Sequence, residues 1–413
     1  MEHRMNNKTT DKVQETGSAE DLQRVIPVVF AANDRYAPYA GVAIASLIAH
    51  VDPQKSYRIF MLHTGISHRH IEMLEALSTA NVTVCCLNVE KAMSTLPASL
   101  PEVGHISRES YYRLLIPKLD ALNVYPYVVY LDCDIIVNSD IAGIIPDDMG
   151  DSLLAGVCDL PQQMPACRER LERDYHLNAE QYINAGVLVF NVGQWMEEGT
   201  ADRCFEYLNN LSGKFLYMDQ DTINIICENR IYYLDIPWNY HWYLLYGEEE
   251  FVEKCRPITE RIGDSFHVLH YTTEIKPWNM PERSLSRYFW KYASQSPFFE
   301  EILTRNVCIR EAETLRNENR KLKVKLDRVQ YDLDCVHASV SFRVGRAITW
   351  APRKLRGGVR CFQDNGAGYT LRRALFHVGL WEDEEAPESP ENRPKLISGA
   401  ERFIKGKREK KKG

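Results

Sequence analysis

The sequence lacks the features that mark several large classes of protein. No C-x-x-C pair occurs among its 11 cysteines, which indicates neither a zinc knuckle nor a disulfide framework but buried, reduced thiols. No apolar run is long enough to span a bilayer, and the polar segment 1–24 contains no signal-peptide core. A net charge of −7 disfavours a protein that coats nucleic acid. We therefore expect a globular cytoplasmic protein without a nucleic-acid partner.

The order of the apolar segments predicts an α/β fold. Strand-like runs occupy residues 25–32, 57–64, 81–89 and 125–137, and later candidates occupy 152–160, 185–192, 231–237 and 265–271. Helix-like amphipathic segments lie between the first four runs, at residues 36–51, 67–80 and 109–122. Alternation of this kind predicts a doubly wound, Rossmann-like parallel sheet with helices on both faces.

We expect the chain to divide into four parts. These are a disordered segment over 1–24, an α/β catalytic domain over 25–300, a helical or coiled-coil segment over 301–340, and a basic amphipathic tail over 341–413.

The third part carries a seven-residue apolar repeat, made of Leu315, Leu322, Val329 and Val336, with Leu326 and Leu333 in a second seam. The repeat is typical of a short coiled coil or a helical hairpin, and packing against the α/β domain is an equal alternative. In the tail, Lys and Arg interleave with Phe, Ile, Leu and Trp. That composition predicts peripheral contact with an anionic membrane surface, with a solvated helical scaffold as the alternative.

Two carboxylates interrupt the apolar run "YPYVVYLDCDIIV" at Asp132 and Asp134. Side chains two residues apart in a strand share a face, so these carboxylates repel unless a cation lies between them or one is protonated. The carboxyl ends of strands are also where open α/β sheets bind ligands. A D-x-D pattern alone is more often a solvated turn, but the apolar context favours a divalent cation that also neutralises a bound diphosphate.

Five stretches, in this order, resemble the family 8 retaining glycosyltransferases, which include bacterial lipopolysaccharide galactosyl- and glucosyltransferases and glycogenin. They are "VVFAANDRYAPYAGVAIASL", "SRESYYRLLIPKL", "VVYLDCDIIV", "YINAGVLVFNVGQW" with "MDQDTINII", and "HYTTEIKPW". The resemblance covers roughly residues 25–290. It implies a single nucleotide-sugar-binding domain of the GT-A type and transfer of galactose or glucose from a UDP-sugar with retention of configuration. It also implies Mn²⁺ as the cofactor, with Mg²⁺ second.

The resemblance assigns roles to individual residues. It implies that Asp132, Asp134 and His270 bind the metal. It implies donor contacts from Ala31, Asn33, Tyr36, Arg113, Asp132, Cys133, Asn184, Ala185, Gly186, Asp219, Gln220 and Lys276. It gives catalytic roles to Arg113, Asp219 and Gln220, makes Asp159 a sugar- or acceptor-side candidate, and lets Trp278 close the site. The chain departs from the family at Asn33 (often Asp), Arg35 (often Asn) and Thr273 (often Gly).

Gln220 stands where a retaining glycosidase would place a carboxylate nucleophile. A same-face attack, in which the leaving phosphate takes the acceptor proton, is therefore favoured. The expected acceptor is a glycan or a lipid-linked glycan. Two other functions stay open. One is a nucleotidyltransferase acting on sugar phosphates, because such enzymes also bind metal through aspartates. The other is a non-catalytic module that binds a nucleotide sugar or a glycan.

Overall fold

The computed structural model describes residues 24–94, 108–210 and 218–341, with isolated residues beyond. By its internal contacts the chain divides into two units, Met1–Ala312 and Glu313–Gly413, and each is described by itself. The predicted disordered segment and nearly all of the basic tail lie outside the described residues, so disorder and membrane contact stay predictions.

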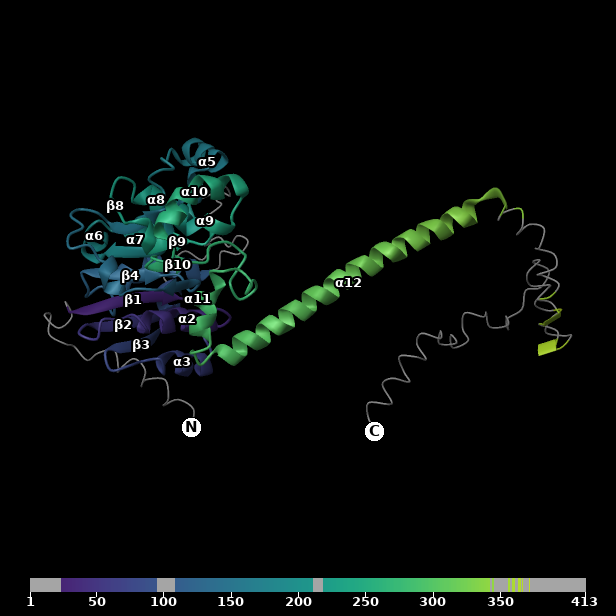
Figure 1. Ribbon diagram of the computed structural model, residues 1–413, viewed down its shortest axis with the longest axis horizontal. Coiled ribbons are helices and arrows are strands. Elements are labelled where there is room, and N and C mark those ends of the chain that lie inside the picture. Colours follow the sequence, from purple (N-terminus) through teal and green to yellow (C-terminus); the bar gives the residue numbers. More distant parts are fainter. Residues whose placement is uncertain are drawn as a thin grey trace. The chain divides into compact units, whose positions relative to one another are not determined.

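A seven-stranded sheet forms the centre of the first unit, in the order β3-β2-β1-β4-β7-β6-β8 (Figure 1). Its strands are β1 (Val25–Ala31), β2 (Ser56–His63), β3 (Val82–Asn88), β4 (Tyr127–Leu131), β6 (Leu154–Cys158), β7 (Ile183–Asn191) and β8 (Ile231–Tyr233). All of them are parallel except β7, which runs antiparallel to both of its neighbours, β4 and β6. The α/β fold class is confirmed, whereas the expectation of an entirely parallel sheet is wrong at β7.

The predicted single strand over 125–137 is in fact two strands in two sheets. β4 ends at Leu131, and β5 (Ile135–Val137) joins a three-stranded sheet with β10 (Val268–His270) and β9 (Tyr240–His241). Asp132 and Asp134 therefore lie in a bend, not in an extended strand, and their same-face spacing does not apply. The bend arises because β5 leaves the main sheet to pair antiparallel with β10, which sets Ile135 opposite His270.

The helices agree with the predictions except for one. The first two are α2 (Ala37–Ile48), with a proline in its first turn, and α3 (His68–Glu75), where the Ser67 hydroxyl accepts the backbone N–H of His70 as an N-cap. The third, expected over 109–122, is instead a 3-10 helix, η1 (Arg108–Lys118). Pro117 lies inside it and lacks the N–H that an α-helical hydrogen bond would need.

The other described helices follow the later strands. They are α4 (Glu90–Ser94), α5 (Pro165–Tyr175), α6 (Val192–Glu197), α7 (Thr200–Asn209), α8 (Met218–Ile226), α9 (Tyr243–Tyr246), α10 (Glu249–Ile262), α11 (Ser286–Ala293) and α12 (Phe299–Ala338), with 3-10 turns η2 (Ile141–Ile144), η3 (Leu160–Gln163) and η4 (Ile236–Asn239).

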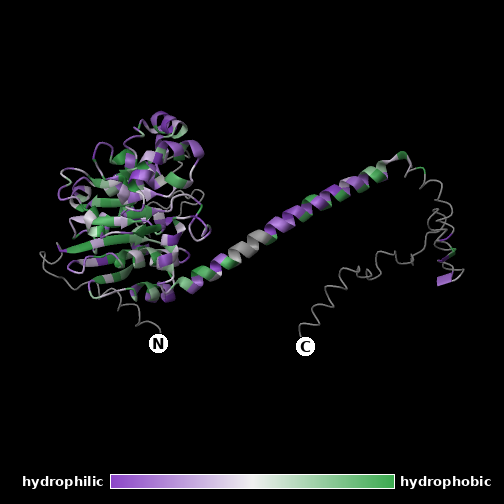
Figure 2. Ribbon diagram, in the orientation of Figure 1, coloured by the Kyte–Doolittle hydropathy of each residue, from purple (hydrophilic) through white to green (hydrophobic). Residues whose placement is uncertain are grey.

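Two apolar clusters cover the two faces of the main sheet. Along β1, Val28 and Phe30 belong to one cluster, whereas Val29 between them belongs to the other. The strands of the sheet are accordingly hydrophobic along their length (Figure 2). This pattern explains the near-continuous apolar runs of the sequence, because a strand buried on both faces has no polar side.

The second unit is described mainly as the continuation of α12. From residue 315 to 341 every side chain is exposed, and hydrophilic residues predominate along this part of the helix (Figure 2). Among the described residues, none of the helices combines the length and the apolarity that crossing a bilayer requires.

Close packing of α2 against Phe298, just before α12, gives a stability prediction. A Cβ atom at Gly41 would meet the fully buried ring of Phe298 at 2.3 Å. We expect Gly41→Ala to lower the free energy of unfolding by about 1–3 kcal/mol because the ring must move within a packed core. Urea unfolding followed by fluorescence measures this. Gly65→Ala, where nothing lies within 4 Å, is the matched control and should change little; equal effects would refute the packing argument.

Candidate functional site

A cavity of about 540 Å³ opens beside the bend between β4 and β5. Eleven of the predicted site residues line it: Arg113, Asp132, Asp134, Asp159, Asn184, Ala185, Gly186, Asp219, Gln220, His270 and Lys276. They come from η1, the β4–β5 bend, the N-cap of η3, β7, α8, β10 and the loop after β10. Segments distant in sequence thus meet at one end of the sheet.

Asp132, Asp134 and His270 converge at the cavity wall. Each offers one ligand atom, and the three atoms all lie within 4.8 Å of one another. Nε2 of His270 is 3.5 Å from Oδ1 of Asp134 and 3.9 Å from Oδ2 of Asp132. Two carboxylate oxygens and an imidazole nitrogen form a donor set suited to a divalent cation.

The imidazole of His270 is oriented by an amide behind it. Asn239 donates its Nδ2 to Oδ1 of Asn184 at 2.9 Å, so its oxygen faces His270. Nδ1 of His270 is 2.9 Å from that oxygen and acts as the donor. The lone pair of the ring is therefore on Nε2, which points to the two carboxylates, as a metal-binding histidine requires.

Gly186 provides space beside the same cluster. A Cβ atom at this position would lie 2.3 Å from Cε1 of His270 and 2.7 Å from Oδ2 of Asp132. Any side chain would therefore push the imidazole and the carboxylate apart. The family resemblance assigns Gly186 to the donor site. The structure gives it a second role, because the absence of a side chain allows His270 and Asp132 to approach each other.

Two cations compensate the carboxylates. Arg113, only 5% exposed, donates from Nη2 to Oδ1 of Asp132 at 3.0 Å, and its Nε lies 3.2 Å from Oδ2 of Asp219. Lys276 donates to Oδ2 of Asp134 and to the backbone carbonyl of Tyr271. Although burial opposes ionisation, the charge of Lys276 holds the pKa of Asp134 well below its usual range.

A chain of side-chain amides continues from Asn239 across the cavity. Asn184 donates to Oε1 of Gln220 at 3.1 Å, and the backbone N–H of Ala185 donates to the same oxygen at 2.9 Å. Gln220 in turn donates from Nε2 to Oδ2 of Asp159 at 2.9 Å. The amide oxygen of Gln220 thus accepts two hydrogen bonds from the protein.

Asp159 and His241 also line the cavity, and the ring centroid of His241 lies 5.5 Å from that of His270. Burial raises the pKa of Asp159 to about 6, although hydrogen bonds from Gln220 and Asn184 lower it. Nδ1 of His241 is 3.8 Å from Oδ1 of Asp159. Its Nε2 is buried and has no hydrogen-bond partner among the described residues.

Sequence reasoning missed Asn239 and His241. Both belong to the segment "IPWNYHWYLL", and they reach the site because β9 pairs with β10. The sequence does contain a signal for them, because Asn239 and His241 are two polar residues at strand spacing within an otherwise apolar segment.

The predicted nucleotide-base loop does not line this cavity. Tyr36 is 36% exposed, and the Asn33 side-chain oxygen accepts the backbone N–H of Tyr36, which makes it part of the turn into α2. Cys133 donates to the backbone carbonyl of Ala31 at 3.2 Å. Trp278, expected to close the site, is buried and stacked on Tyr39, with ring centroids 3.8 Å apart.

Thr273 takes a left-handed backbone conformation with φ of 77°. This conformation is unfavourable for a β-branched residue and is readily adopted by glycine, which explains why glycine is expected at this position. The backbone of the loop that carries Lys276 therefore has a conformation that suits glycine, whereas this chain has threonine at position 273.

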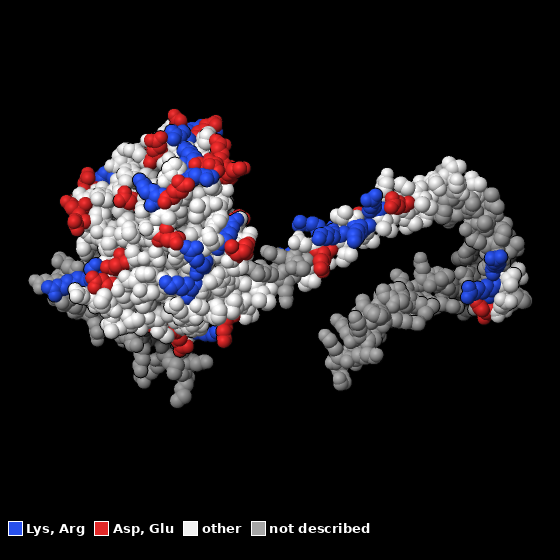
Figure 3. All heavy atoms as spheres, in the orientation of Figure 1, with Lys and Arg blue, Asp and Glu red and all other residues white. Residues whose placement is uncertain are grey.

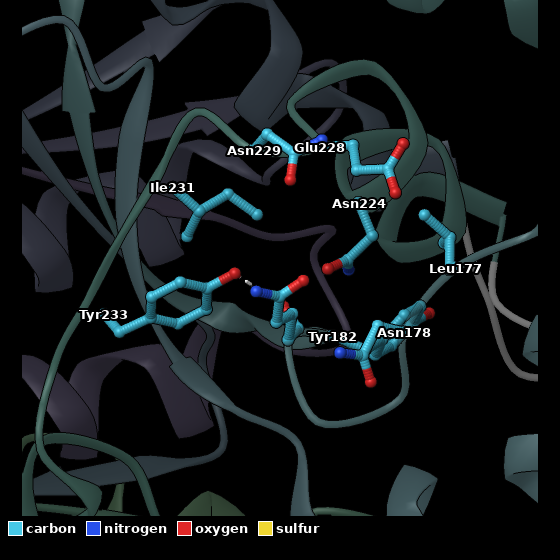
Figure 4. Close-up of a pocket in the computed structure, with 9 residues that line it drawn as sticks. Leu177, Asn178, Tyr182, Asn224, Glu228, Asn229, Ile231 and Tyr233 are labelled. Carbon is cyan, nitrogen blue, oxygen red and sulfur yellow. Dashed lines mark hydrogen bonds between the residues drawn. The ribbon is translucent and has the colours of Figure 1, made fainter.

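A second pocket lies between the start of β7, the end of α8 and β8 (Figure 4). It is lined by Tyr182, Asn224, Tyr233 and their neighbours, and its volume is about 10 Å³. That is room for about one water molecule, so this pocket is too small for a sugar nucleotide.

Comparison with known proteins identifies the class. The model of glycosyl transferase family 8 matches residues 27–281, and the chain belongs to that family. Membership of this family makes the chain a glycosyltransferase, and its fold is of the GT-A type.

Individual relatives agree with this class. The lipopolysaccharide 1,2-glucosyltransferase of Escherichia coli is 26% identical over 78% of this chain and 92% of its own length. The bifunctional glycosyltransferase WbbM superimposes with a TM-score of 0.60 at 26% identity, over 69% of this chain and 52% of that one. The galactosyltransferase LgtC, solved with donor and acceptor sugar analogs, shares the fold with a TM-score of 0.53 at 24% identity, over 66% of this chain and 96% of its own.

The raised pKa of Asp159 predicts a pH dependence of stability. The ordinary pKa is 3.8, so folding favours the protonated acid; the resulting stability is complete below about pH 4 and is lost as the pH rises through about 6. Asp159→Asn cannot ionise. Relative to wild type, it should gain about 3 kcal/mol between pH 4 and pH 7, since one pKa unit is worth about 1.4 kcal/mol.

Thermal unfolding at several pH values measures the difference between Asp159→Asn and wild type. Asp147→Asn, at an exposed carboxylate, is the control and should track wild type at every pH. A pH-independent difference for Asp159→Asn would contradict the raised pKa.

Proposed function

We propose that this chain transfers a hexose, glucose or galactose, from a UDP-sugar to a glycan or lipid-linked glycan acceptor, with retention of configuration and with Mn²⁺ as the cofactor. One observation carries the proposal: the convergence of Asp132, Asp134 and His270 on a cavity large enough for a nucleotide sugar. Two relatives, a lipopolysaccharide 1,2-glucosyltransferase and a lipopolysaccharide 1,3-galactosyltransferase, support this donor and acceptor class.

The residues present fit a divalent cation, because the ligand atoms converge, the free Nε2 of His270 faces the carboxylates and Gly186 leaves room beside them. Asp132, Asp134 and His270 would hold the ion. When bound, it would neutralise the diphosphate and stabilise the negative charge of the departing UDP. Lys276, beside Asp134, would add a point charge on the same diphosphate.

The sugar would lie between Arg113, Asp219 and the amide chain. Buried Asp219 is held by Arg113 and can accept hydrogen bonds from sugar hydroxyls. The acceptor side would be formed by Asp159 and His241, since both line the cavity and the Nε2 of His241 is without a partner among the described residues.

The position of Gln220 bears on the reaction path. Its amide oxygen accepts hydrogen bonds from Asn184 and Ala185, which withdraw electron density and favour a binding role over a nucleophilic one. We therefore favour same-face attack: the acceptor oxygen bonds to the anomeric carbon, the carbon–oxygen bond to phosphate breaks, and the acceptor proton passes to the departing phosphate oxygen. A nucleotidyl transfer, by contrast, would release pyrophosphate.

The proposal is tested by measuring UDP release from UDP-glucose, UDP-galactose and other UDP-sugars, with Mn²⁺, with Mg²⁺ or with chelator. We expect slow donor hydrolysis with one of the two hexoses, highest with Mn²⁺ and lost with chelator. Pyrophosphate release from UTP and a sugar phosphate would point to a nucleotidyltransferase. Donor binding without any UDP release, in the folded protein, would point to a binding module.

Gly186→Ala tests the metal site without removing a ligand. The added methyl group displaces His270 and Asp132, so we expect Mn²⁺ affinity by calorimetry to fall at least about tenfold and UDP release to fall about 100-fold or more. Gly193→Ala is the matched control, because its nearest neighbour would lie at 3.9 Å. Unchanged Mn²⁺ affinity in folded Gly186→Ala would refute the assigned ligands.

A further inference from the structure

A regular seam runs along the exposed part of α12. Its positions alternate spacings of four and three residues: Leu315, Asn319, Leu322, Leu326, Val329, Leu333 and Val336. We call this set the α12 seam. Its apolar members are 45–66% exposed, and the rest of this helix surface carries charges of both signs (Figure 3). Alternating spacings of four and three place every member on one side of a helix, as in the core of a coiled coil.

We propose that the α12 seam binds the α12 seam of a second copy of this chain, in a parallel two-stranded coiled coil with the two helices in register. In heptad notation Asn319, Leu326 and Leu333 occupy position a, and Leu322, Val329 and Val336 occupy position d. The pairing would remove from water the large apolar side chains that the helix exposes, which is the driving force for association.

Asn319 determines the orientation and the register. It is the polar member of an otherwise apolar seam. In a parallel, in-register pair the two Asn319 amides face each other and can hydrogen-bond. In any other alignment each amide would be buried against leucine or valine without a partner, which costs free energy. Antiparallel and shifted pairings are therefore disfavoured.

The charges beside Asn319 favour the same alignment. In a parallel coiled coil, position g of one helix meets position e of the next heptad on the other. Glu318 occupies g and Lys323 occupies e, and both side chains are exposed. Glu318 would therefore lie beside the partner's Lys323, and symmetry gives a second such ion pair. Five residues apart, the two side chains do not face each other within one helix.

Asn319 also determines the number of chains. Leucine at a with valine at d, as in Leu326 and Val329, by itself favours assemblies of more than two helices. A single asparagine at position a favours two strands, since a facing amide pair is satisfied there. The seam covers about three heptads, so we expect a dissociation constant in roughly the micromolar range.

The test is the molar mass of the full chain by light scattering and sedimentation, over about 1–100 µM. We expect twice the chain mass of 47.7 kDa at the upper end. Leu326→Glu, which places two unpaired carboxylates face to face, should weaken association at least about 100-fold. Val324→Glu, on the opposite side of the helix, is the matched control and should leave the mass unchanged. A monomer throughout, or equal effects of the two variants, would overturn the proposal.

Charge exchange tests the alignment. Glu318→Lys and Lys323→Glu should each weaken association several-fold, and the double variant should restore it, because only a parallel, in-register pair brings positions 318 and 323 together. Additive losses would overturn the alignment. Asn319→Leu should raise the mass above that of two chains, and a wild-type mass of four chains would overturn the two-stranded assignment.

Discussion

Pairing of Asp132 with Arg113 and of Asp134 with Lys276 compensates two negative charges at the end of a buried strand. Both carboxylates are partly buried, with side chains 27% and 16% exposed, so each would cost free energy without its partner and the bend after β4 is stabilised by η1 and by the loop after β10. The site therefore depends on packing between segments distant in sequence. Lys276 also lowers the pKa of Asp134, and the ionised carboxylate is the state that can bind a metal ion.

Reversal of β7 explains the composition of the site. In an entirely parallel sheet, the amino end of β7 would lie at the edge opposite the carboxyl end of β4. Because β7 is antiparallel to β4, its first residues, Asn184–Gly186, lie beside Asp132, whose backbone N–H donates to the carbonyl oxygen of Gly186 at 2.8 Å. The same reversal brings the start of α8 close enough for Gln220 to bond to Asn184 and Ala185.

Local sequence patterns predicted the features that depend on neighbouring residues, namely the strands of the main sheet and the starts of helices. The apolar runs predicted the strands of the main sheet, and Pro38 and Ser67 predicted the starts of two helices. The division of residues 125–137 between two sheets was missed, because it depends on pairing with β10, far along the chain. Asn239 was missed for the same reason. The resemblance to family 8 supplied His270, which no local pattern separates from an ordinary buried histidine.

Thr273 holds the loop before Lys276 in an unfavourable backbone conformation. A β-branched residue held at φ of 77° stores about 1–3 kcal/mol, which a rotation of the adjoining peptide plane would release. The lysine is tethered at present to Asp134 and to the carbonyl of Tyr271, both in the immediate neighbourhood. The proposed diphosphate would compete with both partners for the ammonium, so its binding and the conformation of this loop would be coupled.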